Sequence, residues 1–265
     1  MAFDPPDFDA ACSAGSSRLT VTEGELLFVG PLTDVRVHAH PVACVLVGLD
    51  APFDVEAAGA RFTSDLVYVA PGAANALTVR GRRACVLYFE PDTCTSMALE
   101  TAFGDVITDL GNHAWRGPAH QARACAMSAT DAGAVLAAAL PGLRAVRRTC
   151  DSRIGYLLRR IRAQGMERVS QEHAADAIGS ATSTMLRLFH HEARTTFRTY
   201  KMWTGLRYAL AHYARGASVS GAGLDAGFAD AAHFTRRFRT IFGVTPGEVL
   251  KPLRPRARRI APNHE

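Results

Sequence analysis

Two histidines spaced by one residue are the first candidates for binding chemistry in this chain. His38 and His40 lie in the run Val-His-Ala-His, which begins at Val37 and reads as a strand. Alternate residues of a strand point to the same face, so both imidazoles are expected on one side of the sheet. Imidazole nitrogens bind transition metals, and Cys44 follows closely enough to join them. A full metal centre would need a further carboxylate or histidine from neighbouring strands.

Two arginines form a second set of candidates, because each lies on the second helix of a predicted helix-turn-helix unit. The first unit comprises a helix over Gln171–Ala177, a turn that ends at Ser180, and a second helix over Thr182–His191. Ala175 is small enough for the two helices to cross closely, and Gly179 tolerates a positive φ. The apolar anchors of the second helix are Met185, Leu188 and Phe189.

The same plan recurs further along the chain. A helix over Ser220–Ala226, a turn at Gly227 and a second helix over Ala231–Phe242 form the second unit, and a long helix over Phe197–Ala214 joins the two units. Gly243 lies just past the predicted end of the last helix, as is usual at a helix C-terminus. Two recognition helices on one face, if parallel and about 34 Å apart, would enter successive turns of the major groove. The anchors of the second unit are Phe234, Phe238 and Ile241.

Charge is divided unevenly along the chain. Residues 1–140 carry 8 Lys and Arg against 16 Asp and Glu, whereas residues 141–265 carry 22 against 9, so the net charges are −8 and +13. A basic half favours a polyanionic partner, because contacts to phosphates release counterions. A solvated basic face without a partner is the alternative that charge alone leaves open.

The elements that would hold these residues fall into two groups. Short apolar or alternating runs separated by Gly and Pro turns fill residues 18–90, which predicts a β-sandwich or small barrel. Helical spacing follows over 94–103 and 119–140, and short helices continue after Asp151, which is a good N-cap. The N-terminus carries acids and prolines in place of a secretory signal, and no run approaches the ~18 apolar residues of a membrane span. We therefore expect a cytoplasmic protein with no membrane partner.

The second unit also carries the signature of a known family. The segment from Ala226 to Pro246 contains Gly-Phe, then His-Phe-x-Arg-x-Phe-Arg, then Gly-x-Thr-Pro, and it resembles the AraC/XylS transcription regulators. The first unit fits the same family through Met-x-Arg-x-Phe at Met185 and Phe-x-x-Tyr at Phe197. The resemblance is specific over about residues 151–250 and looser over the strand-rich half.

The chain departs from the family pattern at several positions. Ala222 and Gly223 stand where Ile-Ala is usual, which should loosen the first helix of the second unit. Ala181 replaces the usual capping serine of the first recognition helix, and Ser180 is the nearest substitute. Arg194 stands at a common glycine position after that helix.

The resemblance implies which residues contact DNA. The base-reading positions of the family fall on Ser183, Leu186, Arg187, Ala232, His233 and Arg236. Arginine can bridge O6 and N7 of guanine, so Arg187 and Arg236 are expected to read bases directly, and an ion pair within the domain is the alternative for both. The residues expected to contact phosphates, which position the protein without specifying sequence, are Thr182, Arg237 and Arg239.

The order of parts also resembles the family, and it implies a cupin-like barrel that binds a small effector and alters how the DNA-binding domain is presented. Cupin metal sites open with His-x-His but usually add a glutamate and, after a Pro-Gly turn, a late histidine. Here Cys44 lies in the first region, and Ala-Ala-Asn follows Pro71 and Gly72. We therefore expect His38 and His40 to line an effector pocket and expect no cofactor. A nonclassical metal site on His38, His40 and Cys44 is the alternative.

Together these patterns predict an α+β protein with an N-terminal cupin-like barrel or sandwich plus helices, and an all-α C-terminal domain with two helix-turn-helix units. The expected segments are an effector-binding domain over 1–118, a helical linker or dimerisation segment over 119–150, the DNA-binding domain over 151–250, and a basic flexible tail over 251–265. The expected partners are a double-stranded DNA operator, a small-molecule effector, a second copy of the chain and RNA polymerase.

The function predicted from these parts is a sequence-specific, effector-responsive transcription regulator that is not an enzyme. One alternative is a cupin-type metal-dependent enzyme or metal sensor fused to a DNA-binding domain, which the missing metal ligands disfavour. Another is a nonspecific architectural DNA-binding protein, which two matched recognition helices disfavour.

Overall fold

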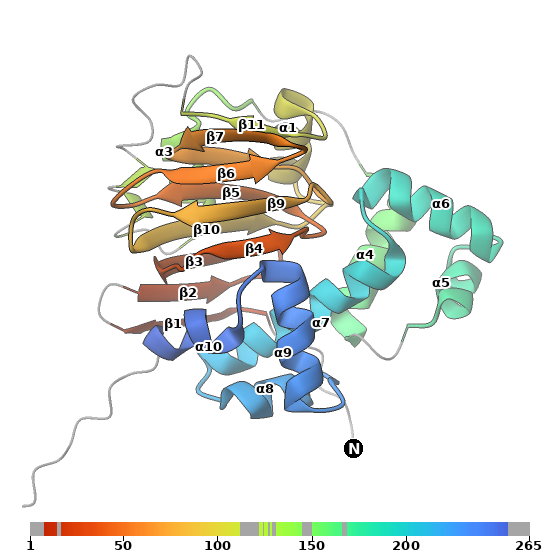
Figure 1. Cartoon of the computed structure of the whole chain (residues 1–265). Coiled ribbons are helices and arrows are strands. Elements are labelled where there is room, and N and C mark those ends of the chain that lie inside the picture. The colour runs from red at the N-terminus through yellow and green to blue at the C-terminus, as the bar shows by residue number, and fades with distance from the viewer. Residues whose placement is uncertain are drawn as a thin grey trace, which may run out of the picture.

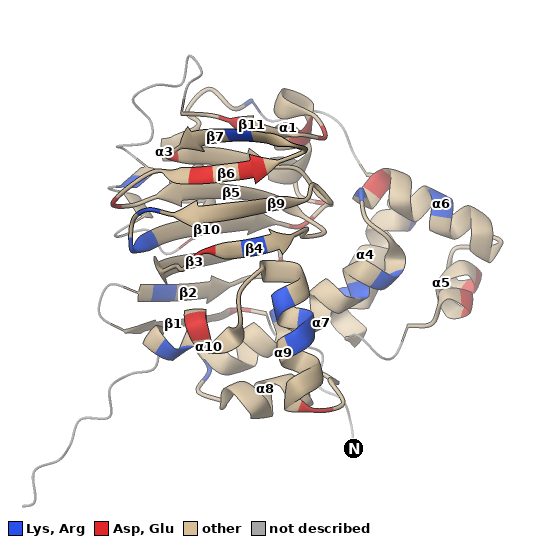
Figure 2. Ribbon diagram, in the orientation of Figure 1, with Lys and Arg blue, Asp and Glu red and all other residues tan. Residues whose placement is uncertain are grey.

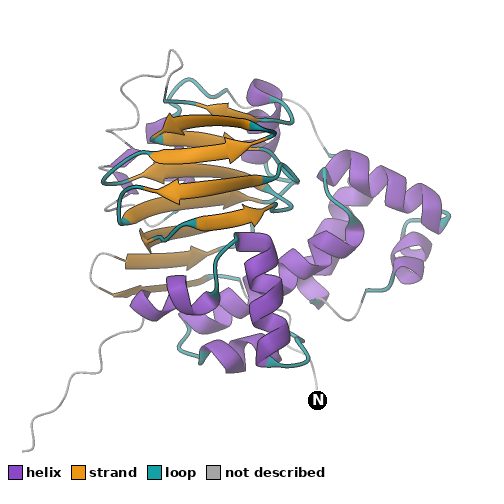
Figure 3. Ribbon diagram, viewed as in Figure 1, coloured by secondary structure: helices purple, strands orange, loops and turns teal. Residues whose placement is uncertain are grey.

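A two-sheet barrel and a set of helices make up the molecule, as Figures 1 and 3 show. The computed structural model describes residues 8–14, 17–111, 122–123, 125–126, 128, 131–144, 150–165 and 169–253. The strands come from the N-terminal half and most helices from the C-terminal half, so the predicted α+β, two-domain fold with a cupin-like barrel is confirmed. None of the described helices is long and apolar enough to cross a bilayer.

The barrel consists of two antiparallel sheets whose strands lie far apart in sequence. In order across the sheet, the larger contains β1 (Ala10–Ala14), β2 (Ser17–Val21), β3 (Glu25–Pro31), β10 (Arg83–Phe89), β5 (Ala43–Gly48), β8 (Leu66–Val69) and β11 (Ile107–Asp109). The smaller sheet contains β4 (Val35–His38), β9 (Asn75–Val79), β6 (Phe53–Ala57) and β7 (Ala60–Ser64). Residues 18–90 thus form strands as predicted, and β11 lies beyond that range.

The central strands of the larger sheet are buried on both faces, which explains their continuous apolar runs. In β5, Cys44 and Leu46 belong to the core inside the barrel, whereas Val45 and Val47 belong to a second core on the outer face. Helix α3 (Ala132–Ala139) packs on that outer face against β3 and β10. Helix α1 (Cys94–Phe103) has the bounds that its sequence predicts.

The C-terminal helices follow the sequence prediction closely. Both helix-turn-helix units and the long helix between them occur where the sequence predicts them. Asp151 caps the helix that precedes the first unit through its side chain. The first recognition helix runs two residues further than predicted, to Ala193. The elements are α4 (Ser152–Gln164), α5 (Gln171–Ala177), α6 (Thr182–Ala193), α7 (Phe197–Ala214), α8 (Val219–Asp225), α9 (Ala231–Phe242), α10 (Pro246–Leu250) and η1 (Lys251–Leu253).

One continuous apolar core joins the inside of the barrel to the helical half. Helix α7 packs against β1 and β2, and α9 packs against β4. The backbone N–H of Arg36 in β4 donates to the carbonyl of Gly243 at 3.2 Å. A Cβ on Gly243 would lie 2.4 Å from a methyl carbon of Val35, so this close approach of the two halves requires glycine.

Ordered structure continues past the expected start of the tail at Lys251. The turn Lys251–Leu253 packs against β1, β2 and β3, and Leu253 is buried. Residues 254–265 of the predicted tail lie outside the described residues, as do 112–121 and 145–149 around and within the predicted linker. The predicted role of 119–150 in dimerisation stays a prediction.

Candidate nucleic-acid interface and effector pocket

The first helix-turn-helix unit is formed by α5 and α6. Ser170 caps α5 through its hydroxyl, and Gly179 adopts a φ of +61° in the turn. Met185 and Phe189 are fully buried on the inner face of α6, and Ala175 lies buried at the crossing. These are the packing roles that their types and spacing predict.

The N-terminus of α6 has no side-chain cap. Its N-cap position is Ala181, and the hydroxyl of Ser180 donates to the carbonyl of Ala181 instead of accepting from an amide of the helix. The expectation that Ser180 substitutes for the usual capping serine is therefore wrong. The first amides of this recognition helix are left without that partner, and such amides are ready donors for an anion.

The outer face of α6 combines predicted and unpredicted residues. Ser183 and Arg187 are exposed, whereas Thr182 and Leu186 are half-buried, so these two offer only part of their surface to a ligand. Thr184 and His190 are exposed on the same helix and were not predicted. The i, i+4 and i+7 spacing of Ser183, Arg187 and His190 is the signal that could have identified His190.

The second unit is formed by α8 and α9, with Gly227 in the turn at a φ of +88°. Gly223 does not simply loosen α8, as its sequence suggests. A Cβ at this position would lie 2.8 Å from Cγ of Phe234, so glycine lets α9 cross α8 at short range. Phe234, Phe238 and Ile241 are buried on the inner face of α9, as predicted.

The outer face of α9 is basic. Ala232 and Arg236 are exposed, and His233, Arg237 and Arg239 are half-buried. Asp230 caps the helix by accepting the amide N–H of His233 at 2.6 Å, and Nε of Arg237 donates to Nε2 of His233 at 3.2 Å. Figure 2 shows the basic residues of α9 in blue.

Neither predicted base-reading arginine is engaged inside the protein. Among the described residues, no ion pair or hydrogen bond involves the guanidinium of Arg187 or of Arg236. The alternative that each forms an ion pair within the domain is therefore not supported in the part of the chain that the structure describes.

The two recognition helices run in different directions. In Figure 1, α6 crosses the view while α9 runs down it. The parallel arrangement that would place both in successive turns of one groove is not the arrangement of this structure.

A buried polar cluster holds the helical half to the barrel. Glu90, directly after β10, accepts from Nε1 of Trp203 at 2.7 Å and from the guanidinium of Arg207 at 2.5 Å through one oxygen. Its other oxygen accepts from the hydroxyl of Tyr200 and, at 3.3 Å, from Arg162. Asp92 completes the cluster with a bidentate pair to Arg162 at 2.8 and 2.9 Å. No sequence signal identifies these contacts, because they join residues of opposite halves.

Arg194 adds a second link near the end of α6. It adopts a φ of +55°, the left-handed conformation that explains why glycine is common at this position. Its side chain forms ion pairs of 3.6 Å with Glu100 and 3.5 Å with Asp105, both from the barrel half. Arg194 thus has a strained backbone conformation, and its ion pairs connect the end of the first unit to the barrel.

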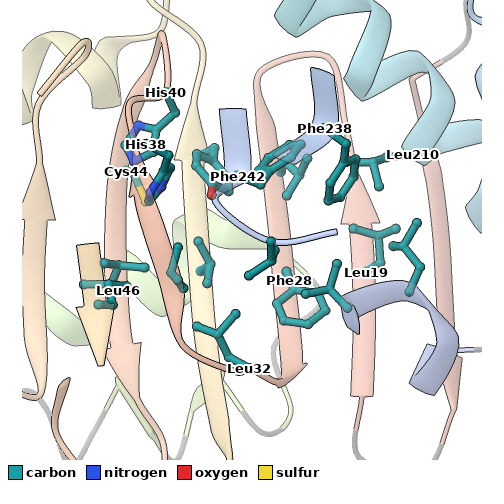
Figure 4. Close-up of a pocket in the computed structure, with 18 of the residues that line it drawn as sticks. Leu19, Phe28, Leu32, His38, His40, Cys44, Leu46, Leu210, Phe238 and Phe242 are labelled. Atoms are coloured by element: carbon teal, nitrogen blue, oxygen red, sulfur yellow. The ribbon is translucent and has the colours of Figure 1, made fainter. Parts of the chain in front are cut away.

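A pocket lies between the barrel and the second unit. It is a cavity of about 60 Å³, and its wall comes from both halves. Figure 4 shows Phe238 and Phe242, from the back of α9, facing Leu19 and Phe28 of the barrel. Other apolar lining residues are Leu26, Leu46, Leu77, Leu210, Val244 and Leu250.

One end of the pocket is polar, and His38, His40 and Cys44 gather there (Figure 4). Nδ1 of His38 lies 2.9 Å from the carbonyl oxygen of Arg36, and Nδ1 of His40 lies 3.0 Å from that of Val42. Burial lowers the pKa of His38, and burial followed by the neighbouring His38 lowers the pKa of His40 to about 3. Both imidazoles are therefore neutral at pH 7.

The alternative metal site is not supported by this geometry. Burial raises the pKa of the Cys44 thiol well above its usual range, and the thiol is hydrogen bonded to Tyr88. A protonated thiol is a poor metal ligand. Among the described residues, no group of three or more His, Cys, Asp or Glu is placed to hold a metal ion.

A family model described as a helix-turn-helix domain matches residues 174–252, which contain nearly all of both units. This helical half therefore contains the helix-turn-helix domain that the resemblance to the AraC/XylS regulators implies. No curated protein sequence matches the chain.

The two-domain architecture as a whole is similar to that of ToxT from Vibrio cholerae. ToxT bound to an unsaturated fatty acid has a TM-score of 0.53 and 10% identity, with 87% of this chain and 96% of that chain covered. ToxT bound to (E)-4-(8-methylnaphthalen-1-yl)but-3-enoic acid has a TM-score of 0.57 and 8% identity, with 87% of this chain and 100% of that chain covered. At these identities the likeness establishes a shared fold.

Proposed function

We propose that this protein is a sequence-specific transcription regulator whose barrel pocket binds a small effector and thereby controls the second recognition helix. The observation that carries the proposal is that α9 contributes one face to the basic surface and another face to the pocket wall. Its outer face presents Arg236 to solvent, and its inner face supplies Phe238 and Phe242 to the pocket wall. Occupancy of the pocket and the position of a recognition helix are therefore physically linked.

The outer faces of α6 and α9 suit DNA contact in two ways. Arg187 and Arg236 are exposed, and neither guanidinium forms an ion pair or hydrogen bond with a described residue, so each can approach the O6 and N7 atoms of a guanine. The neighbouring positions Ser183, Leu186, Ala232 and His233 would contact base edges. The residues proposed for phosphate contact are Thr182, Arg237 and Arg239, and the amides at the uncapped start of α6 can add to them.

The size of the cavity explains how an effector would act. A cavity of about 60 Å³ is smaller than the ~150 Å³ that holds a benzene molecule. A larger ligand must therefore move part of the wall, and the wall includes Phe238, Phe242 and Val244 at the end of α9. A ligand that binds a shifted position of α9 more tightly will populate that position, and DNA that selects the same position will favour the ligand.

The different directions of α6 and α9 support a regulated change of arrangement. Both units are fastened to the barrel. The first is held through Arg194 and through α4, whose Arg162 pairs with Asp92, and the second through Gly243 and the pocket. Simultaneous entry of both helices into one duplex requires a change in their relative orientation. Effector binding is proposed to bias that change.

Assembly and polymerase contact belong to the same proposal. A homodimer would place two DNA-binding domains on adjacent half-sites, as operator-binding proteins commonly do. Contact with RNA polymerase would connect operator binding to transcription. Sedimentation of the full chain with and without operator tests whether it forms a homodimer.

The proposal is tested by selecting bound fragments from random duplex DNA with the full chain. We expect enrichment of one motif, and loss of that enrichment when Arg187 and Arg236 are both replaced by alanine. Arg61→Ala, on exposed β7, is a matched control that removes the same charge elsewhere. Equal recovery of all sequences by the unmodified protein would contradict sequence-specific binding.

A further inference from the structure

We infer that the pocket selects an uncharged, largely apolar ligand whose polar head donates hydrogen bonds, as an alcohol, a phenol or an amide N–H does. This inference rests on the proposed effector role of the pocket and names the chemical class of its ligand. It comes from the hydrogen-bonding capacity that remains unused at the polar end.

The first unused group is a side-chain oxygen. Asn75 lines the pocket and is only 2% exposed. Its amide nitrogen donates to the carbonyl of Ala73 at 3.3 Å, which fixes the orientation of the amide, because a carbonyl can only accept. The remaining atom, Oδ1, is buried without a hydrogen-bond partner. A buried acceptor without a partner destabilises the protein unless a ligand or water supplies a donor.

The second acceptor is a histidine nitrogen. His38 is the cross-strand partner of Asn75, so the two side chains belong to the same part of the barrel. His38 is hydrogen bonded to backbone groups of both Arg36 and Asn75, whereas Nδ1 of His40 faces the carbonyl of Val42 and must therefore carry the ring proton. In the neutral imidazole of His40 this leaves Nε2 as an acceptor. The polar end thus offers two acceptors, from Asn75 and His40.

The other polar groups at this end already have hydrogen-bond partners, and no lining residue carries a charge that could pair with an ionised ligand. Cys44 and Tyr88 are hydrogen bonded to each other. None of the residues that line the pocket is Lys, Arg, Asp or Glu. A carboxylate would be buried beside two acceptors without a cation, and an ammonium would be buried without an anion, so desolvation opposes both. A neutral donor satisfies the acceptors without that cost.

The test uses three probes with one apolar skeleton: 4-propylphenol, 4-propylanisole and 4-propylbenzoate at pH 7, titrated calorimetrically into the full chain. The phenol donates a hydrogen bond, the ether cannot, and the benzoate carries a charge. We expect the phenol to bind about tenfold more tightly than the ether, and the benzoate to bind most weakly. The same series on Asn75→Leu should reduce the preference for the phenol over the ether to less than about threefold.

The outcomes separate the inference from the proposed function. Equal binding of phenol and ether, or tightest binding of the benzoate, would overturn the inference while leaving the pocket as an effector site. Binding of none of the three would contradict the pocket's effector role as well. If Asn75→Leu fails to fold, judged by circular dichroism, the ranking of the three probes on the unmodified protein still decides.

Discussion

At the scale of single residues, exposure and pairing determine which arginines can reach a base. Arg236 is exposed on α9, and no ion pair with a described residue holds it. Arg237, one residue on, is half-buried and donates to His233, so it is oriented along the helix surface. Adjacent arginines of one helix are thus suited to different contacts.

Replacing Arg236 with alanine is expected to reduce operator affinity by about 1–3 kcal/mol and to relax preference at one base pair, because a bidentate guanine contact is lost. Fluorescence anisotropy on the selected operator and on its single-base variants measures both effects. Arg237→Ala is the matched comparison. It should weaken binding to all sequences equally and reduce the salt slope by about one. An unchanged preference in Arg236→Ala would exclude Arg236 from base reading.

His40 makes a separate prediction about stability and pH. Its pKa of about 3 in the folded protein lies below the usual value of 6.5, so the unfolded chain binds the proton first. The stability associated with the neutral ring is complete above pH 6.5 and is lost as pH falls towards 3. Between pH 6.5 and pH 5 the loss is about 2 kcal/mol. Urea unfolding at both pH values should show a smaller loss for His40→Asn, whose amide can still donate to Val42. Equal losses in both proteins would contradict a buried neutral His40.

At the scale of elements, the close crossing of α8 and α9 defines the second unit. Gly223 occupies the crossing because a Cβ there would overlap the ring of Phe234. By contrast, Gly247 in the short helix α10 has open space around its Cβ position. Two helical glycines of one domain therefore differ sharply in what a methyl group would meet.

Gly223→Ala is expected to lower the free energy of unfolding by about 1–3 kcal/mol, because the methyl group overpacks the crossing. Gly247→Ala should leave stability unchanged or raise it slightly, since alanine restricts the unfolded chain. Thermal and urea unfolding of both variants give the comparison. If Gly223→Ala were as stable as the unmodified protein, the crossing would be more open than described.

Sequence predicts these elements well where the signals are local. Capping residues, turn glycines and apolar spacing lie within one unit, which is why α5, α7 and α9 have their predicted bounds. The same signals identify Phe238 as an inner anchor but do not show that Phe242 lines a barrel pocket. Glu90 and its partners on α4 and α7 are distant in sequence, so only the tertiary structure brings them together. The start of α6 shows that a local prediction can also fail. The hydroxyl of Ser180 donates to the carbonyl of Ala181 and therefore does not cap the helix.

At the scale of the whole molecule, the barrel holds both DNA-binding units at once. Glu90 joins α4 and α7 to the barrel, Arg194 fastens the end of α6, and β4 and the pocket hold α9. Because the helices that these links hold also share one continuous apolar core with the barrel, a change at the pocket can alter the relation between the units. The contacts that restrain the helices are the ones that the proposed effector would have to redistribute.

Glu90→Gln is expected to destabilise the docked arrangement by about 3–5 kcal/mol, because Arg207 and Arg162 lose a buried carboxylate partner. The domains should then separate before they unfold, seen as faster proteolysis between them and as two unfolding transitions. Glu56→Gln, in an exposed ion pair on the barrel, is the control and should behave as the unmodified protein. A single unfolding transition at the original midpoint in Glu90→Gln would refute the role of the cluster.

The most direct measurement of the central claim is a hydroxyl-radical footprint of the full chain on its selected operator. If α6 and α9 both read one duplex, the footprint should contain two protected segments on the same face, centred one helical turn or about 10–10.5 base pairs apart. Arg187→Ala should weaken one segment and Arg236→Ala the other. A single protected segment that responds to only one of these substitutions would contradict the account.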